Sequence, residues 1–189
     1  GIVRRVDEQY YTDEWAKCCL LLYKKELLQK PPLCLQRLFF RHPDKMKMFL
    51  EENPSRSFDV ENDYYLPEEA YQDKRAFDCW AECLYEEFPE ILGYIMGKSC
   101  NGKDGAFPHE FIREFLEKQQ NEKLTKAVVY GKFNSRGARI VQDGRTLYEQ
   151  AKCYRAQARE LRLKFPQSAK ILLQLAKWME SEAQHDQLE

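Results

Sequence analysis

The chain has few residues that interrupt helices, and it has no long apolar run. It contains only 8 Gly and 8 Pro in 189 residues, so long helices are easier to place than many short strands and turns. The longest strongly apolar run, Cys18–Tyr23, is far shorter than the ~20 residues that a helix needs to cross a bilayer. The charged N-terminal segment is not followed by an apolar stretch, so we expect no secretory signal. We therefore expect no contact with a membrane.

A disulfide framework is also lacking, although the chain has 7 Cys. Cys18 and Cys19 are adjacent, and Cys79 and Cys83 lie one helical turn apart. Without a secretory signal, we interpret these residues as reduced thiols that pack as small hydrophobic groups. This interpretation predicts a cytoplasmic protein. Because the sequence begins with Gly1 instead of Met, we expect it to be either a processed chain or a fragment of a longer chain.

No catalytic, cofactor or metal motif in the sequence is complete. The segment Gly93–Ser99 has three residues between its glycines where a P-loop needs four, so we interpret it as a helix end. The alternating acids of 59–63 lack the Gly and Glu of a calcium loop. After His109, a zinc-protease helix would carry a second His where this chain has Arg113. We therefore assign no catalytic residue, cofactor or metal ligand, and the sequence favours a role other than catalysis without excluding an enzyme.

The composition and the apolar spacing predict a mainly α-helical fold. Hydrophobic residues make up 43% of the chain and charged residues 32%, which is typical of a folded globular protein. Apolar residues recur at helical spacing, and Pro or a capping residue stands at most of the expected helix ends. The expected helices span about residues 12–29, 32–41, 43–53, 67–88, 89–97, 108–120, 146–164 and 166–185.

Two features of the C-terminal third complete the predicted fold. The short joint Phe165-Pro166 predicts that the last two helices form an antiparallel αα-hairpin. Two β-branched and apolar stretches flank a Gly, Asn and Ser turn, and they allow a small β-hairpin around 127–141. We thus predict a multi-helix bundle that ends in the αα-hairpin, with residues 124–141 as its least determined part.

Charge is distributed unevenly along the chain. Residues 1–121 hold 17 Lys and Arg against 23 Asp and Glu, whereas residues 122–189 hold 13 against 8. Within Ser57–Glu90, eleven acids stand against Lys74 and Arg75 alone. We therefore divide the chain into an acidic helical region, 1–121, and a basic region with the αα-hairpin, 122–189, and expect both to belong to one compact domain.

The cations of the basic region are ordered. Four of them recur at spacings of three, four and three residues, which places them in one row along a helix, and like charges at such spacing destabilise a helix by about 0.2–0.5 kcal/mol per pair. Three further cations alternate with Tyr130 and Phe133 in a Gly-containing segment, a composition that suits phosphate contacts and base stacking. The seven candidate anion-binding residues are Lys132, Arg136, Arg139, Lys152, Arg155, Arg159 and Arg162.

Three interpretations of this charge pattern remain open. The row can be an ordinary solvated helix face, it can contact the acidic segment 57–90 of the same chain, or it can bind RNA or DNA. The function that we expect is a helical protein-interaction module whose partner is another protein or the remainder of a longer chain. The alternative is a nucleic-acid-binding module that uses the basic segment 122–170.

The C-terminal third resembles the C-terminal region of large uncharacterised bacterial proteins. The resemblance covers roughly a third of the chain, from about Tyr130 onward, and it implies a bacterial origin and a C-terminal fragment but no activity. The chain has Arg145 where that family usually has a second Gly. The matching positions are Asn134-Ser-Arg136-Gly137, Gly144, Tyr154-Arg155, Phe165-Pro166 and the acidic last helix.

Overall fold

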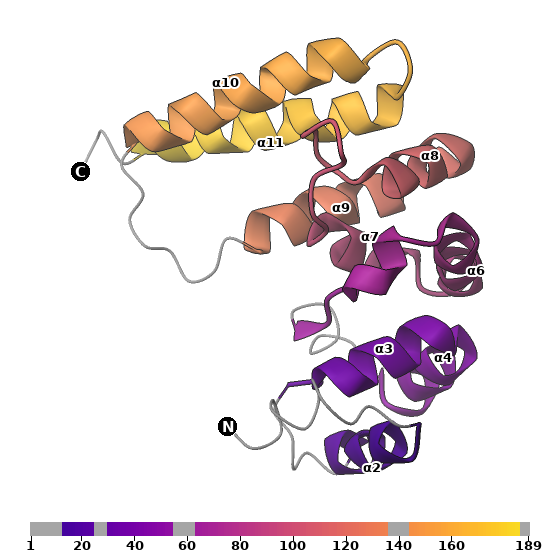
Figure 1. Cartoon of the computed structure of the whole chain (residues 1–189). Coiled ribbons are helices and arrows are strands. Elements are labelled where there is room, and N and C mark those ends of the chain that lie inside the picture. Colours follow the sequence, from indigo (N-terminus) through magenta and orange to yellow (C-terminus); the bar gives the residue numbers. More distant parts are fainter. Residues whose placement is uncertain (1–12, 25–29, 55–62, 136–143, 186–189) are drawn as a thin grey trace. The chain divides into compact units, whose positions relative to one another are not determined.

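The computed structural model describes residues 13–24, 30–54, 63–135 and 144–185, and these residues are mainly helical (Figure 1). They contain no β-strand, so the predicted mainly-α class is confirmed. None of the described helices combines the length and the apolar character needed to cross a membrane. The chain divides into two compact units, Gly1–Ile95 and Met96–Glu189, and the boundary lies within one helix, α7 (Pro89–Gly97). This boundary differs from the change of charge between residues 121 and 122.

Most of the short helices of the first unit begin at proline or at a capping side chain. Pro43 occupies the first turn of its helix, where a missing N–H costs nothing. Asp73 accepts hydrogen bonds from the backbone N–H of Arg75 and Ala76 at 2.9 and 3.1 Å, and it therefore starts a new helix within the expected helix 67–88. The elements are α2 (Asp13–Lys24), α3 (Leu33–Arg41), α4 (Pro43–Glu52), the 3-10 helix η2 (Glu68–Tyr71) and α6 (Lys74–Tyr85).

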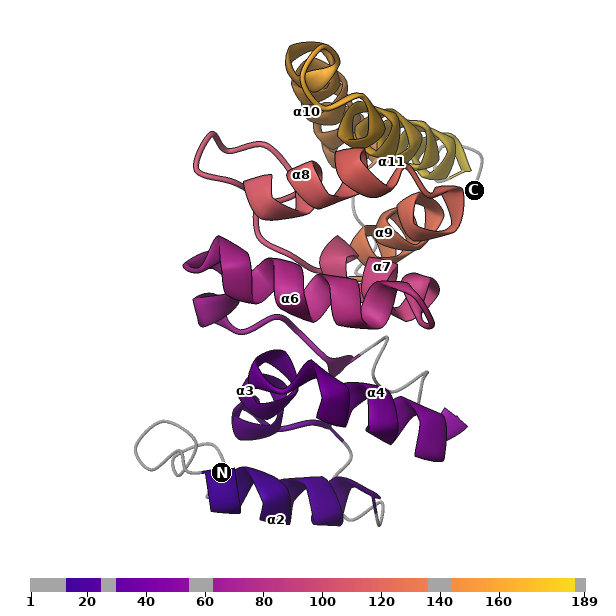
Figure 2. The ribbon, with the colours of Figure 1, turned by 90° about the vertical axis from the view of Figure 1, so that its right-hand side faces the viewer.

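Aromatic side chains fill the core of the first unit. α3 packs against α2, α4 and α6, and Figure 2 shows α2 beside the α3–α4 pair. The ring of Phe49 lies 5.5 Å from those of Tyr23 and Phe39, which joins α4 to α2 and α3. Tyr64 is fully buried, and its hydroxyl donates to the backbone oxygen of Gln36 at 2.9 Å. Burial raises the pKa of Tyr64 well above its ordinary value, so it stays a neutral donor.

The second unit ends in the predicted αα-hairpin. Its elements are the end of α7, α8 (Glu110–Gln119), α9 (Glu122–Asn134), α10 (Gly144–Leu161) and α11 (Pro166–His185). Figure 1 shows α10 and α11 side by side along their length, and Ala151, Ala176 and Met179 form part of the core between them. Small side chains at this contact let the two helices approach closely. α11 also packs against α8 and α9.

The prediction of a possible β-hairpin around 127–141 is wrong for its first strand, because residues 127–130 belong to α9. Asn121 begins this helix, and its side-chain oxygen accepts hydrogen bonds from the backbone N–H of Lys123 and Leu124 at 2.9 and 3.1 Å. Val128 and Val129 are buried on α9, so tertiary packing outweighs their preference for strands. The second half, 138–141, lies outside the described residues.

Gly97 shows why the segment that resembles a P-loop ends a helix. A Cβ at this position would lie 2.7 Å from the backbone nitrogen of Lys132 and 2.8 Å from Cα of Gly131, and it would also overlap the carbonyl oxygen of Val128. The end of α7 therefore lies directly against the backbone of α9, and only a residue without a side chain fits there. Gly97 ends α7, as the sequence predicted, and it also allows the close packing against α9.

Candidate functional site

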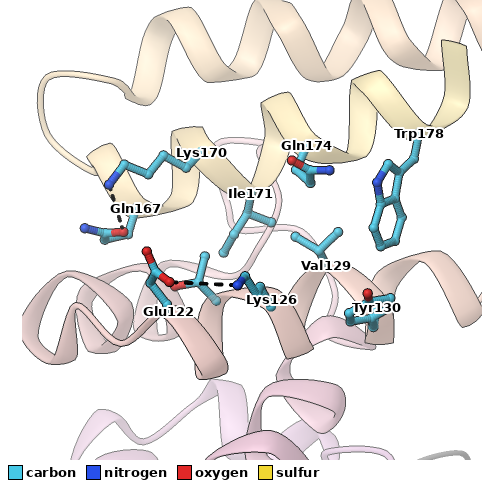
Figure 3. A pocket seen from close by; sticks show the side chains of 10 residues that line it. Glu122, Lys126, Val129, Tyr130, Gln167, Lys170, Ile171, Gln174 and Trp178 are labelled. Carbon is cyan, nitrogen blue, oxygen red and sulfur yellow. Dashed lines mark hydrogen bonds and ion pairs between the residues drawn. The ribbon is translucent and has the colours of Figure 1, made fainter. Parts of the chain in front are cut away.

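A groove of about 430 Å³ lies between α9 and α11 in the second unit (Figure 3). Each helix contributes one face to it, because the lining residues of each follow at spacings of three, four or one residues. The volume is within the range of small-molecule sites and large enough for one or two side chains of a partner. The groove is lined by Glu122, Thr125, Lys126, Val129, Tyr130, Gln167, Lys170, Ile171, Gln174 and Trp178.

One end of the groove is aromatic. Figure 3 shows Val129 and Ile171 between the two helices, with Tyr130 and Trp178 together beyond them. The rings of Tyr130 and Trp178 are 5.0 Å apart, and Phe133 meets the other side of Trp178 at 5.1 Å, edge to face. Tyr130 is nevertheless 46% exposed, so an apolar surface remains open to solvent here.

The other end of the groove carries weakly held polar side chains. Glu122 and Lys126 form an ion pair at 3.8 Å, but the two side chains are 90% and 73% exposed. The Nζ atom of Lys170 donates to Oε1 of Gln167 at 3.5 Å, a long contact on an exposed surface. Exposed pairs of this kind contribute little to stability, so both lysines can turn toward an incoming anion.

The start of α11 is already occupied by an acid of the chain itself. Oε1 of Glu117 accepts hydrogen bonds from the backbone N–H of Gln167 and Ser168 at 2.8 and 3.2 Å. These contacts use the positive end of the helix dipole. A ligand in the groove would therefore be recognised by side chains, and its negative charge would be met by the two lysines.

A buried arginine holds the loop before α8. Arg113 is 1% exposed and binds Asp104 through two hydrogen bonds of 2.7 and 2.8 Å. The Arg113 guanidinium holds the pKa of Asp104 below its ordinary value. Gln157 of α10 accepts from the backbone N–H of Phe107 at 3.3 Å, which fixes the same loop from another side. The terminal nitrogens of Arg113, the carboxylate of Asp104 and the amide of Gln157 all have partners within the unit, so we interpret the cluster as structural.

His109 also has a structural position. It is 4% exposed, and its Nδ1 atom accepts from the backbone N–H of Phe111 at 3.3 Å, which makes it the N-cap of α8. Burial lowers the pKa of His109, while nearby Glu110 acts in the opposite direction. Within the described residues, no three His, Cys, Asp or Glu side chains gather into a set able to bind a metal ion.

The candidate cations of the αα-hairpin differ in how they are paired. Arg155 binds Glu180 of α11 through contacts of 2.8 and 2.6 Å, and Lys152 pairs with Glu149 at 2.8 Å. Arg159 and Arg162 are exposed, and neither has a carboxylate partner among the described residues. Among the described residues, the row thus retains two cations without a carboxylate partner, Arg159 in the last turn of α10 and Arg162 directly after the helix.

The three candidate cations that precede α10 are not seen to extend this row in the part of the chain that the structure describes. Lys132 is half-buried with its Nζ atom 4.3 Å from the ring centre of Phe107, and burial lowers its pKa. Its charge is therefore directed to the interior of the unit. Arg136 and Arg139 lie outside the described residues.

The sequence did not predict the groove, because it left residues 124–141 without a definite secondary structure. Most of α9, which forms one side of the groove, lies in this segment. Without α9 as a helix, Lys126, Val129 and Tyr130 could not be placed on one face. Trp178 is half-buried beside the buried residues Leu175 and Met179 of α11, and a Trp at the edge of an apolar helix face is the signal that could have indicated a surface site. Comparison with known proteins gives no match: no protein family model, no curated protein and no solved structure matches the chain.

Proposed function

We propose that the chain is a helical protein-interaction module and that the groove between α9 and α11 binds its partner. The observation that carries the proposal is the combination in one groove of an exposed aromatic end and an end with two weakly held lysines. Interfaces between proteins are enriched in Tyr and Trp at their buried centre, with polar residues around it. The groove between α9 and α11 has this composition.

The partner that fits is a short segment of another protein with a bulky apolar side chain and a neighbouring carboxylate. The apolar side chain would lie against Val129, Tyr130 and Trp178. The carboxylate would be bound by Lys126 and Lys170, which outnumber the single acid of the groove, Glu122. Opposite charges at the edge of an interface mainly raise the association rate and select the partner.

Selection from a library of displayed random peptides tests this proposal. The protein would be used as bait, with the variant Tyr130→Ala as a counter-selection that removes peptides bound elsewhere. We expect the recovered peptides to share an aromatic or large aliphatic residue next to Asp or Glu. Recovered peptides without such a pattern, or peptides that bind the Tyr130→Ala variant equally well, would contradict the proposal.

Nucleic-acid binding is a second candidate, and the exposed pair Arg159 and Arg162 favours it. Both cations lack a carboxylate partner among the described residues, and guanidinium groups suit phosphate contacts. Titration with labelled RNA and DNA at two salt concentrations tests this function. Micromolar binding that weakens steeply with salt and is lost in the variant Arg159→Glu/Arg162→Glu would support it, whereas no binding at low salt would exclude it.

A cytoplasmic location belongs to the same proposal. The support is the set of cysteines without framework spacing, which is usual for proteins of reducing compartments. Labelling of the chain in cells, followed by fractionation, measures the location directly.

A further inference from the structure

Two buried cysteines meet between α2 and α3 in the first unit. The Sγ atoms of Cys19 and Cys34 are 3.4 Å apart, with the thiol of Cys34 donating to that of Cys19. Both side chains are buried, at 1% and 0% exposure. The two residues come from different helices, so the contact is made by the fold and not by neighbouring positions in the sequence.

We propose that Cys19 and Cys34 are a dithiol oxidation site that closes to a disulfide when the protein meets hydrogen peroxide. A disulfide needs its sulfur atoms at about 2.05 Å, so the thiols must approach by little more than an ångström from where they already lie. Small changes of the two side-chain torsions can supply this approach. The site is independent of the groove between α9 and α11.

The reaction consumes one peroxide and releases two waters. The thiolate sulfur of one cysteine attacks a peroxide oxygen, the O–O bond breaks, and a sulfenic acid and one water form. The sulfur of the second cysteine then displaces the sulfenic hydroxyl, which leaves with a proton as the second water. The two sulfur atoms are oxidised, the peroxide is reduced, and the product covalently joins α2 to α3.

Access to the pair requires the contact between α2 and α3 to open, because buried thiols react slowly. The adjacent Cys18 is exposed and will meet the oxidant first. A disulfide from Cys18 to Cys34 would give a linked peptide of the same mass as one from Cys19 to Cys34. The variant Cys18→Ser is therefore the matched control that distinguishes the two disulfides. The geometry favours Cys19, since its sulfur atom already touches that of Cys34.

Peptide mapping of the peroxide-treated full chain tests the proposal. Trypsin releases Cys18 and Cys19 in peptide 18–24 and Cys34 in a peptide that ends at Arg37, so the disulfide links these two peptides. After the remaining thiols are blocked, we expect the linked peptide to be the main disulfide product of the native protein. We expect the same product from the variant Cys18→Ser and its loss in the variants Cys19→Ala and Cys34→Ala.

Comparison with the denatured chain distinguishes a built site from random oxidation. In urea the pairing of the seven cysteines depends on loop length and no longer on the fold, and many pairs compete, so we expect the share of the linked peptide to fall several-fold. Loss of the linked peptide in Cys18→Ser would overturn the proposal. An unchanged share in urea, or full oxidation of exposed thiols without this product, would overturn it as well. Because Cys18 is exposed, its variant is expected to fold and keeps the test decisive.

Discussion

At the scale of single residues, the second unit depends on positions that allow little change. Gly97 permits the end of α7 to touch the backbone of α9, and Arg113 holds the loop before α8 from a buried position. The sequence could show that Gly97 is a helix end, but not that a second helix lies against it. Such contacts between distant segments have no periodicity, so they follow only from the fold.

Replacement of Gly97 by Ala should destabilise the second unit. The added methyl group would overlap backbone atoms of α9, which cannot move as a flexible side chain can. We expect a loss of about 1–3 kcal/mol in the free energy of unfolding, the usual cost of overpacking. Urea denaturation measures this loss. The variant Gly105→Ala cannot serve as the control, because Gly105 has a positive φ that strains other residues. The control is Ala156→Gly on the exposed face of α10, which should cost only about 1 kcal/mol.

The buried His109 should make stability depend on pH. Because burial lowers its pKa in the folded chain, the unfolded chain binds the proton more readily, and its contribution to stability is complete above the ordinary pKa of about 6.5. We expect the free energy of unfolding to fall as the pH is lowered from 7 toward 5. The variant His109→Asn can still cap α8 but does not titrate there, so its stability should fall less. Equal slopes for the two proteins would show that His109 does not contribute.

At the scale of helices, local signals predicted most elements and failed where a cap or a packing partner decided the outcome. Proline and apolar spacing placed α3, α4, α7 and α11 close to their observed bounds. The expected helix 67–88 is divided by the cap at Asp73. The error at α9 has a physical cause, since Val128 and Val129 favour strands in isolation and are helical here because α9 is capped and packed.

The cap of α9 can be tested by removing one side chain. The variant Asn121→Ala loses the two hydrogen bonds to the backbone N–H of Lys123 and Leu124. We expect a loss of about 1 kcal/mol in the free energy of unfolding and faster hydrogen exchange in the first turn of α9. The variant Asn121→Asp keeps an acceptor and should retain most of the stability. If Asn121→Ala is as stable as the original chain, the cap does not determine where α9 begins.

At the scale of the whole molecule, the change of charge along the sequence and the boundary between the compact units fall at different positions. The division at residue 121 followed the balance of acids and bases, whereas the compact units divide between Ile95 and Met96. A contact of the cation row with the acidic segment 57–90, one of the three interpretations that the sequence left open, would involve both units and stays untested. Within the described part of the second unit, Arg155 is paired across the αα-hairpin and Lys132 lies over an aromatic ring, so these two cations are engaged inside the unit.

The central claim is that the groove between α9 and α11 binds a partner, and two lysines of α11 allow a direct test. Lys170 lines the groove, whereas Lys177 is exposed on the same helix and does not line it. The Kd of a selected acidic peptide would be measured by fluorescence anisotropy for the variants Lys170→Glu and Lys177→Glu, which have the same net charge. The account predicts a Kd roughly tenfold weaker for Lys170→Glu alone, about 1.4 kcal/mol. Equal Kd values for the two variants would contradict it.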